Sequence, residues 1–161
     1  MTATAAPESI TVARANAPHV AVIGAGLAGL VTALRLRRAG ARVTLVTKGV
    51  GGLQLGHGTI DLLGYDPERV TNPAKGIEAF AAKHPEHPYA KIGVEAVRSG
   101  VELLSEILGE KLVNGSADEN VLVPTAVGAA RPTAFIPESM KAGVLHGDAK
   151  MVIIGVAQYK D

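Results

Sequence analysis

The first pattern of apolar and polar residues along this chain predicts a strand, a helix and a second strand. Residues 20–23 form a short apolar run that leads into Gly24-x-Gly26-x-x-Gly29. Gly40 stands where a helix would end in the left-handed conformation, and a second apolar strand follows. This order predicts an α/β fold, a Rossmann-like FAD/NAD(P)-binding βαβ domain with a parallel sheet. Between the glycines and Gly40, apolar side chains recur at the i, i+3, i+4, i+7 spacing of a half-buried helix: Leu27, Leu30, Val31 and Leu34.

The middle of the chain has the period of two amphipathic helices. Asn72 and Pro73 are a start signal, a capping residue followed by proline at the first helical position. This helix is expected to end before His84, where two His-Pro pairs interrupt the pattern. A longer helix is then predicted to end at Gly109 and to pack on the sheet, from apolar residues at helical spacing: Val94, Val97, Val101, Leu104 and Leu108.

The last third of the chain changes to short strands and turns. Asn114-Gly115 predicts a turn, residues 121–123 begin a strand, and residues 125–136 predict a small β-hairpin that turns near Gly128. Residues 151–155 have the character of another buried strand. Such a strand should lead into a covering helix, and the remaining residues are too few to form one. We therefore expect a C-terminally truncated piece of a longer polypeptide.

The glycine spacing after the first strand is the strongest chemical signal. Gly24 permits a tight turn, Gly26 lets the backbone approach a pyrophosphate, and Gly29 lets the helix pack close to the strand. The N–H groups at the start of the helix are suited to the anion. The predicted dinucleotide site therefore includes these glycines and the backbone of Ala25 and Leu27. An apolar βαβ unit that binds nothing is the alternative.

The end of the second strand distinguishes between nucleotides. Sites for an adenosine ribose commonly carry Asp or Glu about 20 residues after the first glycine, and Thr47 and Lys48 stand there. Thr47 can bond a ribose without the strength of a carboxylate, and Lys48 either pairs with a phosphate or is solvated. Flavoenzymes similar to succinate dehydrogenase and fumarate reductase end this strand in a hydroxyl residue and lysine. The pattern favours FAD over NAD, and FMN stays open unless the glycines contact a pyrophosphate.

A glycine-rich passage follows over residues 49–66. Its backbone can press amides against a ligand, and an ordinary surface loop is the alternative. His57 can approach a bound ring system or have a structural role. Asp61 is expected to form a turn or a cap. The residues of this passage predicted to contact the cofactor are Gly49, Gly56, Gly58 and Thr59.

Arg131 and His57 are the candidate catalytic residues. Arg131 is a cation among small and apolar residues, so it needs an anionic partner, which is either a substrate phosphate or carboxylate or an internal acid. No residue stands out as a general base, and His57 is the least implausible one. No metal site is predicted, because His84 and His87 each precede a proline, which favours extended backbone over a shared helical face.

Composition narrows the function classes. A formal net charge of +1 provides no field for nucleic acid, and 3% aromatic residues leave no stacking platform for bases. Without cysteine, these residues hold no disulfide and no Cys-ligated iron–sulfur or zinc site. The apolar run over residues 20–34 is shorter than the about 20 residues of a bilayer span. Residues 1–17 lack the apolar segment of a signal peptide, so a disordered leader and a cytoplasmic location are expected.

Several motifs together carry a resemblance to a known family. Taken in the order in which they follow one another along the chain, they resemble the second flavin-binding subunit, designated B, of the anaerobic glycerol-3-phosphate dehydrogenases. The resemblance extends over essentially the whole chain, which in turn covers well under half of that subunit. The glycine motif is general to flavoproteins, whereas GTIDLLGY, HPY and PTAVGAARPT are more specific. The motifs are GAGLAGLVTALRL, VTKG, GHGTIDLLGY, HPY, LVPTAVGAARPTAFIPESM and VIIG.

The resemblance implies a flavin-binding protein that takes part in oxidising sn-glycerol 3-phosphate to dihydroxyacetone phosphate, with electrons passed toward menaquinone. Residues 18–161 would then be the N-terminal part of a flavin dinucleotide-binding domain. The implied partners are the catalytic FAD-bearing subunit of the same complex, together with an iron–sulfur subunit, which attaches the complex to the inner face of the cell membrane. Related dehydrogenases carry a covalent flavin on a loop histidine, and Leu55 stands near that position here, so a noncovalent flavin is expected. The alternatives are a reductase that uses NAD(P) or FAD on another substrate, and a non-catalytic electron-transfer or scaffold flavoprotein.

Overall fold

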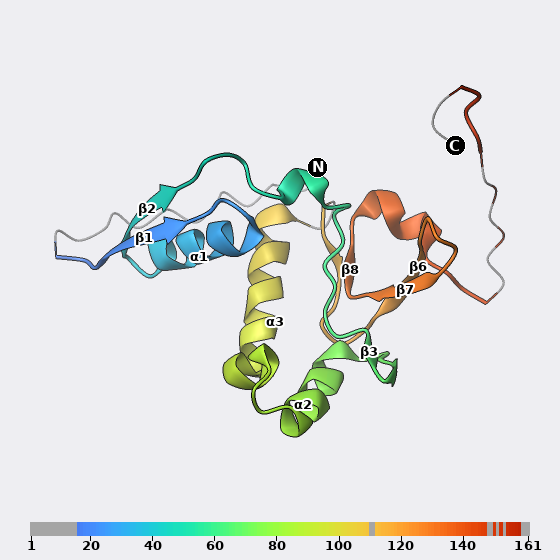
Figure 1. Cartoon of the computed structure of the whole chain (residues 1–161), viewed down its shortest axis with the longest axis horizontal. Helices are drawn as coiled ribbons and strands as arrows, with labels where there is room; N and C mark the ends of the chain where they lie inside the picture. Colours follow the sequence, from blue (N-terminus) through green and yellow to red (C-terminus); the bar gives the residue numbers. More distant parts are fainter. Residues whose placement is uncertain (1–15, 110–111, 148–149, 151, 153, 159–161) are drawn as a thin grey trace, which may run out of the picture. The chain divides into compact units, whose positions relative to one another are not determined.

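The computed structural model describes residues 16–109, 112–147, 150, 152 and 154–158. The chain divides into two compact units, the first ending at His57 and the second beginning at Gly58. Nearly all of the predicted leader lies outside the described residues. Each unit is built around its own short strands and helices (Figure 1).

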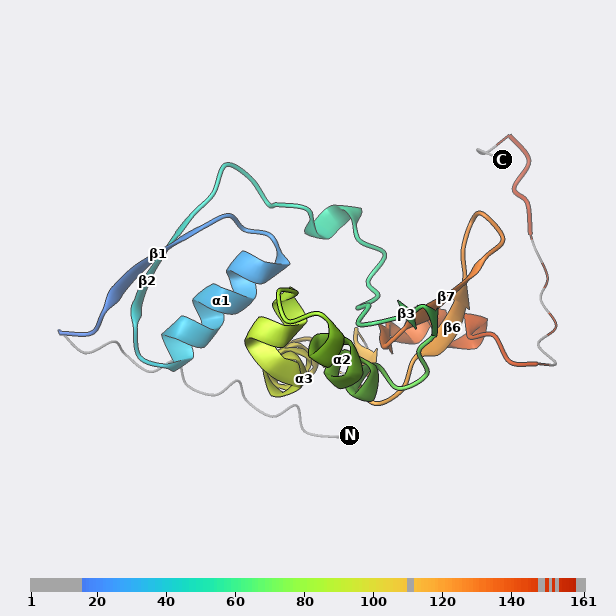
Figure 2. The same cartoon turned by 60° about the horizontal axis from the view of Figure 1, so that its bottom comes forward.

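The first unit is the predicted strand–helix–strand. Strand β1 (His19–Ile23) pairs in parallel with β2 (Arg42–Val46), with His19 opposite Arg42 and Ile23 opposite Val46. Helix α1 (Leu27–Arg38) crosses between them and lies along the pair in both views (Figures 1 and 2). Gly40 has a φ of 85°, which confirms the left-handed end of this helix. The α/β character is confirmed, while the parallel sheet has two strands among the described residues.

Two helices form one side of the second unit. Helix α2 (Pro73–Lys83) begins as predicted, because the Asn72 side chain accepts a hydrogen bond from the Lys75 N–H at 2.9 Å. Helix α3 (Pro88–Leu108) packs beside it (Figure 2) and ends at Gly109, also as predicted. It starts earlier than its apolar period indicated, since His87 caps a first segment that is interrupted at Gly93.

Short antiparallel strand pairs form the other side of the second unit. A hairpin that turns near Gly128 is confirmed, but its arms are β6 (Val121–Pro124), which lies before the predicted range of 125–136, and β7 (Ala130–Thr133). The other elements are β3 (Tyr65–Asp66) paired with β4 (Glu68–Arg69), β5 (Asn114–Gly115) paired with β8 (Phe135–Ile136), and the 3-10 helices η1 (Leu53–Leu55, in the first unit) and η2 (Glu138–Gly143).

Two sequence predictions in the last third of the chain need correction. Asn114 and Gly115 form a strand instead of a turn, because the missing side chain of Gly115 lets its backbone lie directly against Ala134, where a Cβ would come within 2.0 Å of the carbonyl oxygen. The strand predicted over residues 151–155 does not form among its described residues. Met151 and Ile153 lie outside the described residues.

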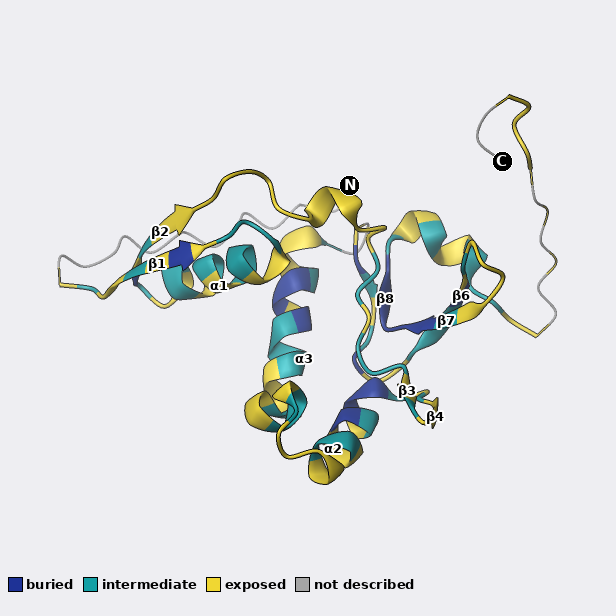
Figure 3. Cartoon of the chain, viewed as in Figure 1, coloured by how far each residue is buried: buried dark blue, intermediate teal, exposed yellow. Residues whose placement is uncertain are grey.

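The core of the second unit joins distant parts of the chain. Buried residues gather on α3, at the start of α2 and along β7 and β8 (Figure 3). Ile60 bridges to Phe135, and the Thr133 hydroxyl, fully buried, lies 3.3 Å from the carbonyl oxygens of Ile60 and Phe135. This places residues 59–61 directly beside the β7–β8 segment. The central cluster consists of Val101, Val113, Ala117, Ala134 and Phe135.

None of the described helices combines the length and apolar character that crossing a membrane requires.

Candidate functional site

The turn after β1 ties the ends of the two parallel strands together. The Gly24 N–H donates a hydrogen bond to the Val46 carbonyl at 2.8 Å, and Gly24 has a φ of 102°. This conformation is open to glycine and rarely to other residues. The turn therefore lies next to Thr47, the first residue after β2.

The start of α1 has the features of an anion site. Gly26 is the N-cap residue, no side chain caps the helix, and no acidic residue lies in its first turn. The first intrahelical bond runs from the Leu30 N–H to the Gly26 carbonyl at 3.0 Å, so the preceding amides have no partner within the helix. A Cβ at Gly26 would meet nothing within 4 Å. Free space, helix-end amides and the positive end of the helix dipole together fit a pyrophosphate.

Gly29 sets the distance between α1 and the turn. A Cβ at this position would lie 2.0 Å from the Gly24 carbonyl oxygen and 3.1 Å from its carbon. Both are backbone atoms, so no side-chain rotation relieves the overlap. Helix and turn approach this closely only with glycine here, which is the packing function that the spacing predicted.

Gly51 packs against the start of α1, a contact that the sequence did not predict for it. Its φ is 69°, and a Cβ would lie 2.7 Å from both the Ala25 carbonyl oxygen and the Gly26 amide nitrogen. The loop after β2 thus packs against the peptide that leads into α1. The consecutive glycines at 51 and 52 were the available signal, although the passage contains so many glycines that the important one does not stand out.

Thr47 shapes the turn that leaves β2. Its hydroxyl accepts a hydrogen bond from the Gly49 N–H at 3.1 Å and donates one to the Gly49 carbonyl. A hydroxyl has one hydrogen and two lone pairs, so one acceptor position remains for a ribose hydroxyl. Lys48 is exposed beside it. A contact of either residue with adenosine stays a prediction.

The rest of the glycine-rich passage is divided between the two units. Gly49 has open space around its Cα, Gly56 ends η1, and His57 is exposed at the end of the first unit. Gly58 has a φ of 82° and lies against the Pro137 side chain in the second unit. The predicted cofactor contacts of these residues stay predictions.

Arg131 lies among polar partners within the second unit. Its Nη2 donates to the Thr59 hydroxyl at 2.9 Å, and its Nη1 lies 3.4 Å from a carboxylate oxygen of Asp61. An internal acid was one of the two partners expected for this arginine. Asp61 thus pairs with a cation on β7, in place of the turn or cap predicted for it. The fold brings Thr59, Asp61 and Arg131 together, across more than 70 residues of sequence.

His84 and His87 have structural contacts. Their rings lie 4.3 Å and 4.9 Å from the Phe80 ring, and His87 Nδ1 accepts a hydrogen bond from the Tyr89 N–H at 3.2 Å. His87 has the extended backbone expected before proline. No cluster of three or more potential metal-ligating residues occurs in the described part of the chain.

A comparison with known families identifies the cofactor of this chain. The model of the FAD binding domain family matches residues 19–161, and so contains both the glycine turn and the second unit. The chain belongs to the FAD binding domain family. Like the rest of this family it is a flavin-binding protein, and its cofactor is FAD. No solved structure matches the chain.

Relatives of this FAD binding domain have similar sequences over nearly the whole chain. A protein of Halobacterium salinarum, named as the probable subunit designated B of an anaerobic glycerol-3-phosphate dehydrogenase, is 33% identical over 89% of the chain. Proteins of Yersinia enterocolitica and Mannheimia succiniciproducens that are named as the same subunit, without the word probable, are 36% and 34% identical, each over 88%. The chain spans about a third of the length of these relatives, since it covers 33% to 35% of them.

Proposed function

We propose that this chain is the cofactor-holding part of the second flavin-binding subunit, designated B, of a quinone-linked glycerol-3-phosphate dehydrogenase. The observation that carries the proposal is the start of α1, where uncapped amides lie beside a Gly26 that leaves open space. The similarity to relatives that are named as this subunit supports it. The proposed reaction is oxidation of sn-glycerol 3-phosphate to dihydroxyacetone phosphate, with electrons passed toward menaquinone.

The backbone has the main task in holding the cofactor. In this proposal residues 24–27 and Gly29 form the pyrophosphate cradle, while Thr47, Lys48 and Gly49 lie on the adenosine side. Gly56 and His57 belong to the loop that continues toward the flavin ring. FAD, when bound, would supply the redox chemistry as the two-electron acceptor for oxidation of the secondary alcohol, while the hydroxyl proton leaves to solvent. With Leu55 near the position of a flavin-linked histidine in related dehydrogenases, the cofactor is noncovalent.

The proposed complex has two further components, a catalytic FAD-bearing protein and an iron–sulfur protein. This chain contains no cysteine, so any cluster in the electron path is held elsewhere. Attachment to the inner face of the cell membrane is then through the iron–sulfur component.

Flavin content of the full-length protein tests the proposal directly. The purified protein should be yellow, and its colour should bleach when glycerol 3-phosphate is added in the presence of the partner subunits. In Gly26→Ala, the new methyl group occupies the space next to the helix-end amides. We expect its affinity for FAD to fall by about tenfold or more, since overpacking by one methyl costs about 1–3 kcal/mol.

Gly100→Ala is the matched control. Gly100 lies in α3 of the second unit, and a Cβ there also meets nothing within 4 Å. Its flavin content should equal that of the wild type. A colourless complex that still oxidises glycerol 3-phosphate would refute the flavin role of this protein, and unchanged FAD affinity in Gly26→Ala would refute the location of the pyrophosphate.

The pairing of Arg131 with Asp61 favours a second candidate function, a flavoprotein that transfers electrons or positions its partners without contacting substrate. In that case Arg131→Ala leaves turnover of the assembled complex at the wild-type level. A clear loss of turnover, with an unchanged unfolding midpoint, would support a catalytic role instead.

A further inference from the structure

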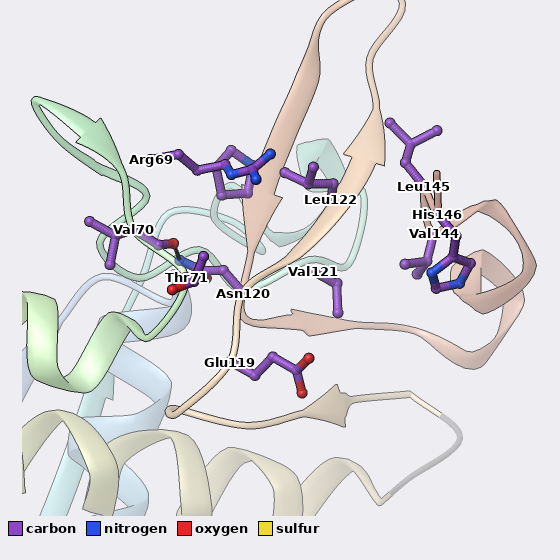
Figure 4. Close-up of a pocket in the computed structure, with 11 residues that line it drawn as sticks. Arg69, Val70, Thr71, Glu119, Asn120, Val121, Leu122, Val144, Leu145 and His146 are labelled. Carbon is purple, nitrogen blue, oxygen red and sulfur yellow. Dashed lines mark hydrogen bonds between the residues drawn. The ribbon is translucent and has the colours of Figure 1, made fainter. Parts of the chain in front are cut away.

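The second unit contains a cavity that the proposed flavin site does not include. It is bounded by residues 69–71, residues 119–122, Pro132 and residues 144–146, and we name it the Asn120 pocket (Figure 4). Its volume is about 230 Å³, slightly below the range of about 300–1,000 Å³ that is usual for ligand sites. A cavity of this size suits a small metabolite.

Hydrogen bonds connect residues 119–122 to residues 63–71 and to residues 144–146, and they hold the pocket in shape. The Asn120 side-chain amide donates to the carbonyls of Leu63 and Val70, at 2.9 and 2.8 Å. The Asn120 N–H donates to the Thr71 carbonyl, and the Leu145 N–H donates to the Leu122 carbonyl, both at 2.8 Å. The walls are therefore positioned before any ligand arrives, which lowers the entropy cost of binding.

Polar side chains from each segment stand around an apolar wall. Arg69, Glu119 and His146 are at the pocket with Val121 and Leu122 between them (Figure 4). Among the described residues, none of these three groups forms an ion pair or a side-chain hydrogen bond, unlike Arg98 and Arg131, which both have carboxylate partners. Polar side chains that share a cavity without internal partners are available to a ligand.

A second cavity extends the same surface. It has a volume of about 430 Å³ and shares Glu119, Val121, Val144 and His146 with the Asn120 pocket. Lys141 lies in its wall. The Lys141 ammonium is paired with Glu138 at 3.6 Å, so the two cavities together leave one arginine, one histidine and the Glu119 carboxylate for a ligand.

We propose that the Asn120 pocket binds a small organic anion that also carries hydroxyl groups. The guanidinium of Arg69 matches the two oxygens of a phosphate or carboxylate. The Glu119 carboxylate accepts hydrogen bonds from ligand hydroxyls, and the apolar wall packs against the carbon skeleton. This site is independent of the flavin contacts, so binding to it does not require FAD.

Calorimetric titration of the full-length protein, prepared without flavin, tests this site. The probes are glycerol 3-phosphate, glycerate and inorganic phosphate, which separate a phosphate ester from a carboxylate and both from an anion without a carbon skeleton. One of the two organic anions should bind more tightly than inorganic phosphate. Arg69→Met should weaken that binding by about tenfold to a hundredfold, because a hydrogen bond to a charged group is lost.

Arg42→Met is the matched control, since Arg42 is an exposed arginine of β2 in the first unit. It should bind the organic anion as the wild type does, and both variants should keep the wild-type unfolding midpoint. The proposal is overturned if neither organic anion binds, if inorganic phosphate binds as tightly as they do, or if Arg69→Met retains full affinity. If Gly26→Ala loses FAD but still binds the organic anion, FAD binding at the glycine turn and anion binding in the Asn120 pocket can be lost independently of each other.

Discussion

Replacing Gly29 by alanine is the sharpest test of how the glycine turn is built. The added Cβ would lie 2.0 Å from the Gly24 carbonyl oxygen, whereas real Cβ contacts essentially never fall under 3.0 Å. Helix α1 and the turn must therefore separate by about 1 Å, because the difference between these distances cannot be taken up by a side chain. The turn resists this movement, since Gly24 is also bonded to Val46 at 2.8 Å.

Two opposing terms set the size of the effect. Overpacking a tight contact costs about 1–3 kcal/mol, and a clash between backbone atoms belongs at the upper end of that range. Alanine in place of glycine inside a helix recovers about 0.5–1 kcal/mol. We expect a net loss of about 2 kcal/mol in the free energy of unfolding of the first unit. Gly100→Ala has only the favourable term, so it should be slightly stabilising.

Hydrogen exchange measured on peptides from residues 19–46 of the flavin-free, full-length protein reports this unit without interference from the other one. Amides of α1, β1 and β2 should exchange faster in Gly29→Ala, while peptides from α2 and α3 keep wild-type rates. If residues 19–46 keep their protection in Gly29→Ala, the close approach of α1 to the turn is not what requires glycine.

Two further predictions concern the second unit. The Arg98 guanidinium is hydrogen-bonded to Asp118 at 2.6 and 2.8 Å and lowers the pKa of that carboxyl. The pair therefore stabilises the fold above the ordinary Asp pKa of about 4, and this stabilisation is lost as the pH falls below that value. In urea titrations the wild type should be more stable than Asp118→Asn at pH 7 and this difference should disappear toward pH 3, whereas a difference that is constant with pH would contradict an ionic origin. Asn72→Ala should lower the free energy of unfolding in urea by about 1 kcal/mol, because the α2 cap is lost. Asn72→Ser should retain most of the wild-type stability, because serine also caps helices. Equal stability of the two variants would argue against capping.

Features fixed by nearby residues could be predicted from the sequence. The glycine turn, the ends of α1 and the start of α2 at Asn72 depend on spacings of a few residues, and the structure has them as expected. The long part of α3 after the interruption at Gly93 follows the apolar period that begins at Val94, whereas the short segment from Pro88 was not predicted, because His87 is not a strong capping residue.

Features that depend on distant residues could not be predicted in this way. Asn114-Gly115 is a strong local turn signal, yet pairing with Ile136 and Phe135 makes it a strand. Arg131 was correctly expected to need an anion, but only the folded chain shows Asp61 beside it. The Asn120 pocket likewise joins three segments with no common motif.

The contact of Thr133 with Ile60 spans 73 residues and has a consequence for biosynthesis. The first unit pairs strands that lie close in sequence, so it can form soon after residue 46 leaves the ribosome. Residues 60–63, which are largely apolar, must instead wait until residue 135 has been translated before their partner exists. During that interval this segment is a natural target for a chaperone, and slow codons between residues 63 and 135 would prolong its exposure.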